Sequence, residues 1–301
     1  MKTACLAVAF ANAVLLGQTS LAPLNADPAP DKTHPPSSTE MIVPSHGEKL
    51  LGIFYTAAGA GDHPMVVLLH GFPGYEQNLD LAQAIRRAGW NVLALHYRGS
   101  WGVGGVFSLE HAMQDADAMV AFARSPAAQR KFHCDPDRVV VIGHSMGGYM
   151  AASAIAHEPA VRGAVMIGTW DITAPTRGAS SLSREQLITR IEKDNGTEPA
   201  DFLPLHGIDP HTLAAEIVDH REVWDLDRLA PKIAPRPVLL LTADDDSDPG
   251  STRFAQALKS AGDKQVEKIH TSTDHGFSGR RIYLESIILK WLSALPLSRP
   301  S

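Results

Sequence analysis

The sequence predicts an α/β fold: a mostly parallel, doubly wound sheet with a helical cap inserted late in the chain. Short apolar runs rich in Val, Ile and Leu, such as those at 65–70 and 139–142, are typical of strands buried on both faces of a sheet. Segments with helical periodicity alternate with these runs, and that order is typical of parallel strands. A length of 301 residues is sufficient for one large domain with a complete core.

The first residues have the pattern of a secretion signal. Lys2 supplies a positive charge, and residues 4–16 form an apolar run that is too short to span a membrane. We therefore expect a signal peptide over approximately 1–26, with cleavage after Ala22 or after Ala26, and a secreted or periplasmic protein.

The proline-rich stretch at 27–39 cannot pack a core, so a flexible leader is expected there. The folded α/β domain is expected over 40–297. After removal of Cys5 with the signal, Cys134 would be the single cysteine, which excludes an internal disulfide. A formal net charge of -6 without a basic stripe argues against nucleic-acid partners, and no membrane span is expected in the mature chain.

The remaining elements follow from periodicity and from their end signals. Leu81, Ile85 and Ala88 share one helical face, and Gly89 ends that helix. Residues 134–138 read as a turn into the central strand. Strands are expected at 50–56, 65–70, 91–96, 162–168, 237–242 and 265–270, and helices at 81–88, 110–124, 250–262 and 280–295. The segment from about 170 to 235 has mixed helical pattern and few core runs, and we expect it to form the cap.

Residues 143–147 read Gly-His-Ser-Met-Gly, between the central strand and an alanine-rich helix. This G-x-S-x-G pattern predicts a sharp strand-to-helix turn that exposes the hydroxyl of Ser145 above the sheet edge. The flanking glycines allow a close approach of strand and helix. The backbone N–H of Met146, at the helix start, is expected to face a developing oxyanion.

A serine nucleophile requires a base and an orienting carboxylate. Ser145, Asp246 and His275 each follow the carboxyl end of a predicted parallel strand, so they are expected at the same edge of the sheet. Their order along the chain is serine, acid, histidine. Asp246 is preferred as the acid because, three residues past Ala243, it matches the position of the acid in the α/β-hydrolases, which these motifs resemble. The alternatives in the same loop are Asp244, Asp245 and Asp248.

These motifs together resemble the α/β-hydrolase superfamily. The resemblance covers nearly everything from residue 40 onward and rests on His-Gly-Phe-Pro-Gly at 70–74, Gly-His-Ser-Met-Gly-Gly at 143–148, the acidic loop, and Asp-His-Gly-Phe at 274–277. Tyr-Arg-Gly-Ser at 97–100 and Asp-Pro-Asp-Arg at 135–138 are similar to dienelactone-hydrolase-like esterases and to the catalytic domain of prolyl oligopeptidases.

The resemblance implies that the N–H of Phe72 joins that of Met146 in the oxyanion hole, and that His70 is a structural residue of its loop. Two departures bear on the activity. The chain has no room for a propeller ahead of the hydrolase domain, and Ala243 stands where those families often have glycine.

The sequence therefore predicts an exported serine hydrolase that cleaves carboxylic esters through an acyl-enzyme, with a small ester or short peptide as substrate. The alternative is an aminopeptidase or oligopeptidase-like amide hydrolase, and a non-catalytic binding protein is a third reading that would not need the triad. No cofactor is expected. No metal is expected either, because the cap histidines (His206, His211 and His220) lack ligand spacing and the loop at 244–248 departs from a calcium-binding loop. Asn195 begins a single glycosylation sequon, for which chance is the simpler explanation.

Overall fold

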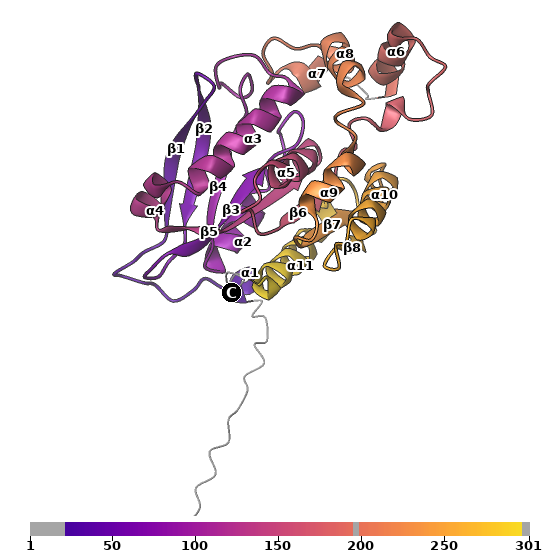
Figure 1. Ribbon diagram of the computed structural model, residues 1–301. Coiled ribbons are helices and arrows are strands. Elements are labelled where there is room, and N and C mark those ends of the chain that lie inside the picture. The colour runs from indigo at the N-terminus through magenta and orange to yellow at the C-terminus, as the bar shows by residue number, and fades with distance from the viewer. Residues whose placement is uncertain (1–21, 195–198, 297–301) are drawn as a thin grey trace, which may run out of the picture.

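The computed structural model describes residues 22–194 and 199–296 (Figure 1). Most of the expected signal peptide, including residues 1–21, and the sequon at Asn195 lie outside the described residues. Within those described ranges no helix combines the length and the apolar character that a membrane crossing needs.

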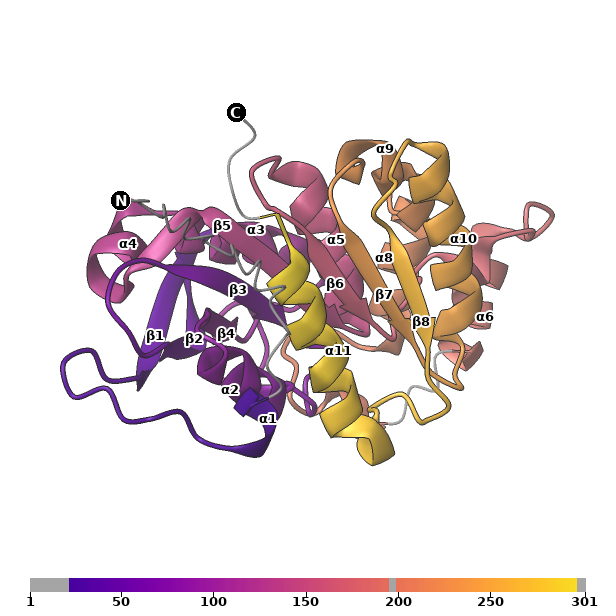
Figure 2. The same cartoon turned by 90° about the horizontal axis from the view of Figure 1, so that it is seen from below.

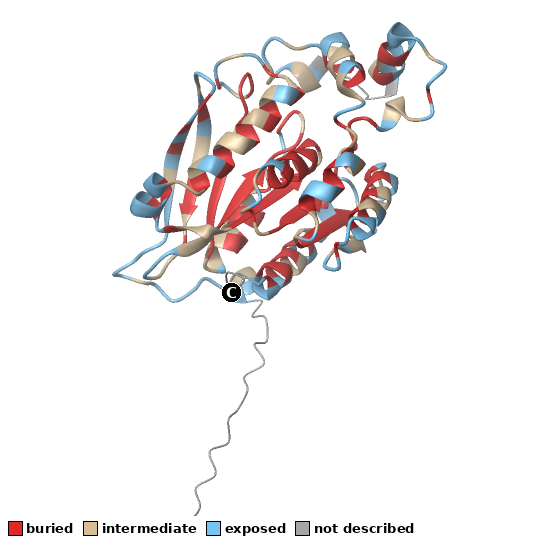
Figure 3. Ribbon diagram, in the orientation of Figure 1, coloured by how far each residue is buried: buried red, intermediate tan, exposed pale blue. Residues whose placement is uncertain are grey.

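The centre of the molecule is an eight-stranded sheet with the order β1-β2-β4-β3-β5-β6-β7-β8. The pairs β1–β2 and β2–β4 are antiparallel and all other neighbours are parallel, which confirms the predicted mostly parallel sheet. The strands are β1 Ser37–Ser45, β2 Glu48–Thr56, β3 His63–Leu69, β4 Asn91–Leu95, β5 Cys134–His144, β6 Ala164–Ile167, β7 Val238–Thr242 and β8 Glu267–His270. Apolar β-branched runs make the central strands buried along their length (Figure 3).

Helices cover both faces of the sheet, so two apolar cores form. α3, α5 and α10 pack on one face, while α2 and α11 pack on the other, the face turned toward the viewer in Figure 2. Trp291 and Leu284 of α11 belong to the second core, as their helical stripe predicts. The helices outside the cap are α1 Ala22–Asn25, α2 Leu79–Arg87, α3 Leu109–Ala123, α4 Pro126–Phe132, α5 Met146–His157, α10 Ser247–Ser260, η3 Ser278–Arg280 and α11 Arg281–Ala294.

The segment between β6 and β7 forms a helical insertion, and its helices α6, α7 and α8 lie above one end of the sheet (Figure 1). It contains η1 Ala174–Thr176, α6 Arg184–Asp194, α7 Pro199–Phe202, α8 Pro210–His220, η2 Leu226–Leu229 and α9 Ala230–Ile233. Its helix α8 reaches α3, because the Glu216 carboxylate accepts hydrogen bonds from the N–H groups of Leu109 and Glu110, both at 3.0 Å. A carboxylate at a helix N-terminus satisfies donors that have no partner within the helix.

Two parts of the chain differ from the expectation. The folded region begins at Ser37, before the expected boundary at 40, because β1 pairs antiparallel with β2 along its whole length. Upstream of β1, the last residues of the expected signal peptide also contact the domain, since the Arg87 Nε donates to the Pro23 carbonyl at 2.6 Å. The stretch 134–138, expected to be a turn, is extended and belongs to β5, where an irregularity in the pairing with β3 accommodates it.

Candidate active site

Ser145 stands at the junction of β5 and α5 with φ 58° and ψ −120°, a left-handed conformation that a serine adopts only when its surroundings impose it. Its N–H donates to the Ile167 carbonyl at 2.8 Å, and its carbonyl accepts from the Trp170 N–H at 3.0 Å. The turn requires glycine at two positions. A Cβ on Gly143 would lie 1.8 Å from the Gly147 carbonyl oxygen, and one on Gly147 would lie 2.1 Å from the Leu69 carbonyl oxygen.

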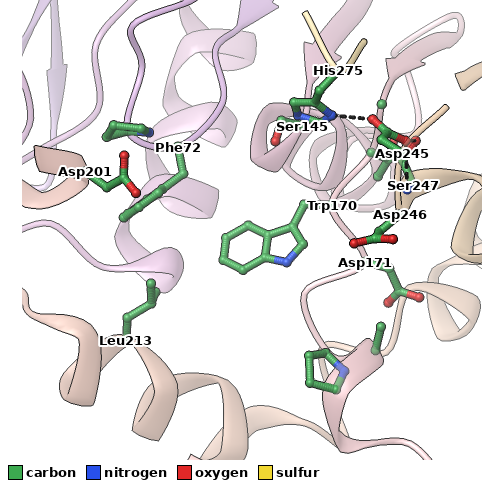
Figure 4. A pocket seen from close by; sticks show the side chains of 15 residues that line it. Phe72, Ser145, Trp170, Asp171, Asp201, Leu213, Asp245, Asp246, Ser247 and His275 are labelled. Atoms are coloured by element: carbon green, nitrogen blue, oxygen red, sulfur yellow. Dashed lines mark hydrogen bonds and ion pairs between the residues drawn. The ribbon is translucent and has the colours of Figure 1, made fainter. Parts of the chain in front are cut away.

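The carboxylate that contacts His275 is Asp245. The His275 Nδ1 lies 2.5 Å from Asp245 Oδ2 (Figure 4). Burial raises the pKa of Asp245, but hydrogen bonds from His275 and from the Ser247 hydroxyl and N–H outweigh it and lower the pKa to about 2. Because an ionised carboxylate only accepts, Nδ1 carries the proton and Nε2 of the neutral ring is free to act as a base.

The expected partner Asp246 is therefore corrected to Asp245. Asp246 is exposed, is the N-cap residue of α10, and borders the same cavity without bonding to His275. The other acids of the loop have different partners: Asp244 accepts from Ser272 and lies 3.0 Å from His270, and Asp248 pairs with Lys268. Neighbouring side chains in a turn point in different directions, so spacing along the sequence does not identify the acid.

Of the two residues whose N–H groups are expected to form the oxyanion hole, Phe72 borders the cavity and Met146 follows Ser145 directly as the first residue of α5. Gly71 packs against Ser145, since a Cβ there would lie 2.9 Å from Ser145 Cβ. Throughout the part of the chain that the structure describes, no acceptor bonds to the N–H of Phe72 or of Met146. Both donors are thus available to a ligand.

His70 lies beneath this loop as a structural residue. Its Nδ1 is 2.8 Å from the Gly71 carbonyl, and its Nε2 is 3.2 Å from His96 Nδ1. Burial lowers the pKa of His70 to about 3 and keeps the ring neutral. A buried neutral imidazole that bonds to its own loop is a support for the loop and not a base.

Sequence reasoning assigned no role to His144, although it precedes the serine. Its Nε2 donates to the His275 carbonyl across 3.0 Å, and the two rings lie 4.8 Å apart. Burial and the neighbouring His275 lower the pKa of His144 to about 4, so the ring is neutral at pH 7. His144 therefore holds the main chain of the loop that carries His275. The sequence feature that could have indicated this role is the position of His144 inside the Gly-His-Ser-Met-Gly motif.

Ser145 and His275 face one cavity of about 470 Å³. They make no hydrogen bond to each other in the described residues; the hydrogen bond of His275 Nδ1 is to Asp245. Figure 4 shows Trp170 projecting between two groups of side chains, with Phe72 and Asp201 on one side and the acidic loop on the other. The walls of the cavity come from the turn at Ser145, the loop after β3, the carboxyl end of β6, the insertion, the loop at 244–248 and the loop that carries His275. The residues that border the cavity are Phe72, Pro73, Ser145, Gly168, Thr169, Trp170, Asp171, Ala174, Pro175, Asp201, Leu213, Asp245, Asp246, Ser247 and His275.

One cavity residue, Asp171, is a buried ion-pair hub. Its carboxylate bonds to Arg177 at 2.5 Å and to Arg253 of α10 at 2.7 Å. Arg177 also meets Asp225 at 3.1 Å, and Arg253 meets Asp227 at 2.5 Å. The network joins the insertion to α10, directly after the acidic loop. Among the described residues no group of three or more His, Cys, Asp or Glu side chains is placed to hold a metal ion.

Comparison with known proteins gives a consistent picture. The sequence profile of the alpha/beta hydrolase family matches residues 66–280. Similar solved structures include an esterase of Pyrococcus furiosus (16% identity, TM-score 0.61, 89% of this chain and 96% of the esterase). A second is an esterase of Pyrobaculum calidifontis (19% identity, TM-score 0.59, 92% of this chain and 90% of the esterase). A third is the acylaminoacyl peptidase of Pyrococcus horikoshii (16% identity, TM-score 0.63, 88% of this chain and 43% of the peptidase). A search of the curated proteins finds no match. At these identities the structural likeness concerns the fold.

Proposed function

Because the chain belongs to the alpha/beta hydrolase family, we propose that it is a serine hydrolase that cleaves carboxylic esters through an acyl-enzyme. Ser145 is the nucleophile, His275 the general base and Asp245 the acid that orients it. The observation that carries the proposal is the 2.5 Å contact between His275 Nδ1 and Asp245 in the cavity that also holds Ser145. This contact fixes the tautomer that leaves Nε2 available to the serine.

The proposed reaction has two halves. His275 Nε2 takes the Ser145 proton as the serine oxygen attacks the ester carbonyl, and the oxyanion is bound by the N–H groups of Phe72 and Met146. The intermediate expels the alcohol, which receives its proton from His275. Water activated by the same histidine then hydrolyses the acyl-enzyme, releases the acid and restores Ser145.

The decisive test is the Ser145→Ala variant assayed on p-nitrophenyl esters. We expect kcat to fall at least about a thousandfold with an unchanged thermal midpoint, because only the oxyanion donors and substrate binding remain. A fluorophosphonate should label the wild-type protein at Ser145 and leave the variant unlabelled. Turnover close to wild type in the variant would refute the mechanism.

An amide hydrolase is the second candidate, supported by the likeness of its fold to the acylaminoacyl peptidase. An amide leaving group must be protonated as it departs, which makes a greater demand on the site than an alkoxide does. Matched ester and anilide substrates with one acyl group separate the two. We expect a higher kcat/KM for the ester, and equal or faster turnover of the anilide would favour the peptidase.

Export is part of the same proposal and rests on Lys2 and the apolar run at 4–16. Fractionation of cells expressing the full chain, with N-terminal sequencing of the exported form, should recover a protein shortened near Ala22 or Ala26. Recovery of only full-length protein in the cytoplasmic fraction would contradict export.

A further inference from the structure

We propose that the cavity selects substrates that carry a cationic group, an ammonium or quaternary ammonium, recognised by Asp201, Asp246 and the face of Trp170. The inference concerns the substrate class and rests on the proposed hydrolase function. It starts from the unbalanced charge of the cavity wall.

Among the residues that the structure describes, four carboxylates border the cavity, and two of them already have partners. Asp245 is bonded to His275 and Ser247, and Asp171 is bonded to Arg177 and Arg253. Asp201 and Asp246 have no hydrogen bond or ion pair within the described parts of the chain, and no lysine or arginine there borders the cavity. A substrate therefore meets two carboxylates without counter-charges.

The surroundings do not cancel this charge. The hub behind the wall holds three carboxylates, those of Asp171, Asp225 and Asp227, against two guanidinium groups, those of Arg177 and Arg253. One negative charge therefore remains in excess there as well. A concave wall of one sign concentrates ligands of the opposite sign and repels those of the same sign.

Aromatic faces stand between the two free carboxylates. In Figure 4 the Trp170 indole projects into the cavity, with Asp246 on one side and Phe72 and Asp201 on the other. The Phe72 and Trp170 rings are 6.3 Å apart. An indole face attracts a cation, and aromatic side chains are a recurring means of recognising quaternary ammonium ligands. The cavity thus combines an aromatic platform with carboxylates of the sign that a cation requires.

The acid at 246 thereby has a different role from that expected from its spacing. It borders the cavity one residue beyond the acid that orients His275. Asp201 reaches the cavity from α7 of the insertion. The insertion and the acidic loop would each contribute one carboxylate to the same substrate group.

The test uses pairs of esters that have the same shape and differ only in charge. For the acyl side, p-nitrophenyl 4-(trimethylammonio)butanoate is compared with p-nitrophenyl 5,5-dimethylhexanoate. For the alcohol side, butyrylcholine is compared with 3,3-dimethylbutyl butanoate. We expect the cationic ester of at least one pair to have a kcat/KM at least about fivefold higher, a preference that shrinks in high salt as charge is screened. Equal or faster turnover of the neutral ester in both pairs would overturn the proposal.

The source of the preference is tested by Asp201→Asn, Asp246→Asn and the double variant. The quantity compared is the ratio of kcat/KM for the cationic ester to kcat/KM for the neutral ester, measured within each protein. The ratio should fall in each single variant and approach one in the double variant. Glu185→Gln is the matched control, because Glu185 is an exposed acid of the insertion that does not border the cavity. A ratio unchanged in the double variant would overturn the role of the two carboxylates.

A binding measurement separates this proposal from the hydrolase function. Calorimetry with choline and with its neutral isostere 3,3-dimethylbutan-1-ol should show tighter binding of the cation to the Ser145→Ala protein, lost in that protein when both aspartates are replaced. Equal binding of the two probes would overturn the cation site even if esters are hydrolysed. Absence of ester turnover in the wild type, with cation binding retained, would instead refute only the hydrolase.

Discussion

At the residue scale, the acidic loop at 244–248 provides a direct test of which carboxylate orients the base. Asp245→Asn replaces the acceptor of the His275 Nδ1 proton, so the wrong tautomer is favoured and Nε2 loses its basic lone pair. We expect kcat to fall at least about a hundredfold. Asp246→Asn, assayed on a neutral ester, should have an effect of less than about tenfold.

The two variants are well matched, because they change neighbouring residues in the same way. Steady-state kinetics on a neutral p-nitrophenyl ester measures both. A larger loss for Asp246→Asn than for Asp245→Asn would show that the loop rearranges when substrate binds and would restore the assignment expected from the sequence.

His144 offers a second test at this scale, as a positioning residue. His144→Phe removes the donor to the His275 carbonyl and retains a ring of comparable size. We expect kcat on the neutral ester to fall about tenfold or more, because a misplaced base loses alignment with the serine. His144→Gln, which retains a donor, should recover part of the loss. Equal kinetics for all three proteins would show that the bond does not position His275.

At the element scale, the strand-to-helix turn makes a prediction about folding. An alanine at Gly147 would place its Cβ 2.1 Å from the Leu69 carbonyl oxygen, so β3 and α5 would have to separate. We expect the free energy of unfolding of Gly147→Ala to fall by about 2–3 kcal/mol or more, measured by denaturant unfolding.

Gly279→Ala is the control, because its Cβ would meet no atom within 4 Å. The two variants make the same chemical change, so only the local space differs. A Gly147→Ala protein as stable as Gly279→Ala would mean that the turn can open without cost.

The elements also show what the sequence can predict. The buried strands β4 and β7 and the helix α11 are apparent because their apolar patterns are continuous or periodic. β1 escaped prediction because only Met41, Val43 and Ser45 are buried, and its first half, residues 37–40, is polar. Ser145 and His275 can be singled out from motifs, and both border the cavity, whereas the carboxylate that contacts His275 depends on how a turn directs neighbouring side chains.

At the scale of the whole molecule, the ion-pair hub anchors the insertion to the sheet domain. Arg253→Met removes the pairs with Asp171 and Asp227 and leaves Asp171, which is 8% exposed, with Arg177 as its remaining cation. Partial loss of a buried network leaves charge poorly compensated. We expect unfolding to become easier by about 1–3 kcal/mol and KM to rise.

The matched control is Arg184→Met, which breaks an exposed pair with Asp219 inside the insertion. Exposed pairs contribute about 1 kcal/mol or less, so its thermal midpoint should stay near that of the wild type. Thermal unfolding and steady-state kinetics are measured on both variants. Equal thermal midpoints and equal KM values for Arg253→Met and Arg184→Met would contradict the anchoring role.

Acid stability is a second property of the whole molecule. The pKa values of buried His70 and His144 lie at about 3 and about 4, below the ordinary value of 6.5. Below pH 6.5 the unfolded chain therefore binds protons at these histidines that the folded chain does not bind. The free energy of unfolding is largest above pH 6.5 and declines as the pH falls toward 4. The expected loss is roughly 2 kcal/mol per histidine between pH 6.5 and 5.

Denaturant unfolding at pH 7 and at pH 5 measures this loss, with His144→Gln as the comparison. The variant has one fewer buried imidazole and should show a smaller difference between the two pH values. A difference equal to that of the wild type would show that His144 does not contribute to acid lability.

The insertion leaves the sheet after β6 and returns at β7, and these two strands are direct neighbours. Because the two strands are parallel, the insertion leaves at the carboxyl end of β6 and returns at the opposite, amino end of β7, and the β6–β7 ladder that fixes these two points does not depend on the insertion. Lengthening such a segment carries a small entropic penalty, so evolution could exchange whole insertions between relatives while the hydrolytic edge stays intact. Such an exchange would have to supply new acceptors for Arg253 and for the N-terminus of α3, because the present insertion provides both.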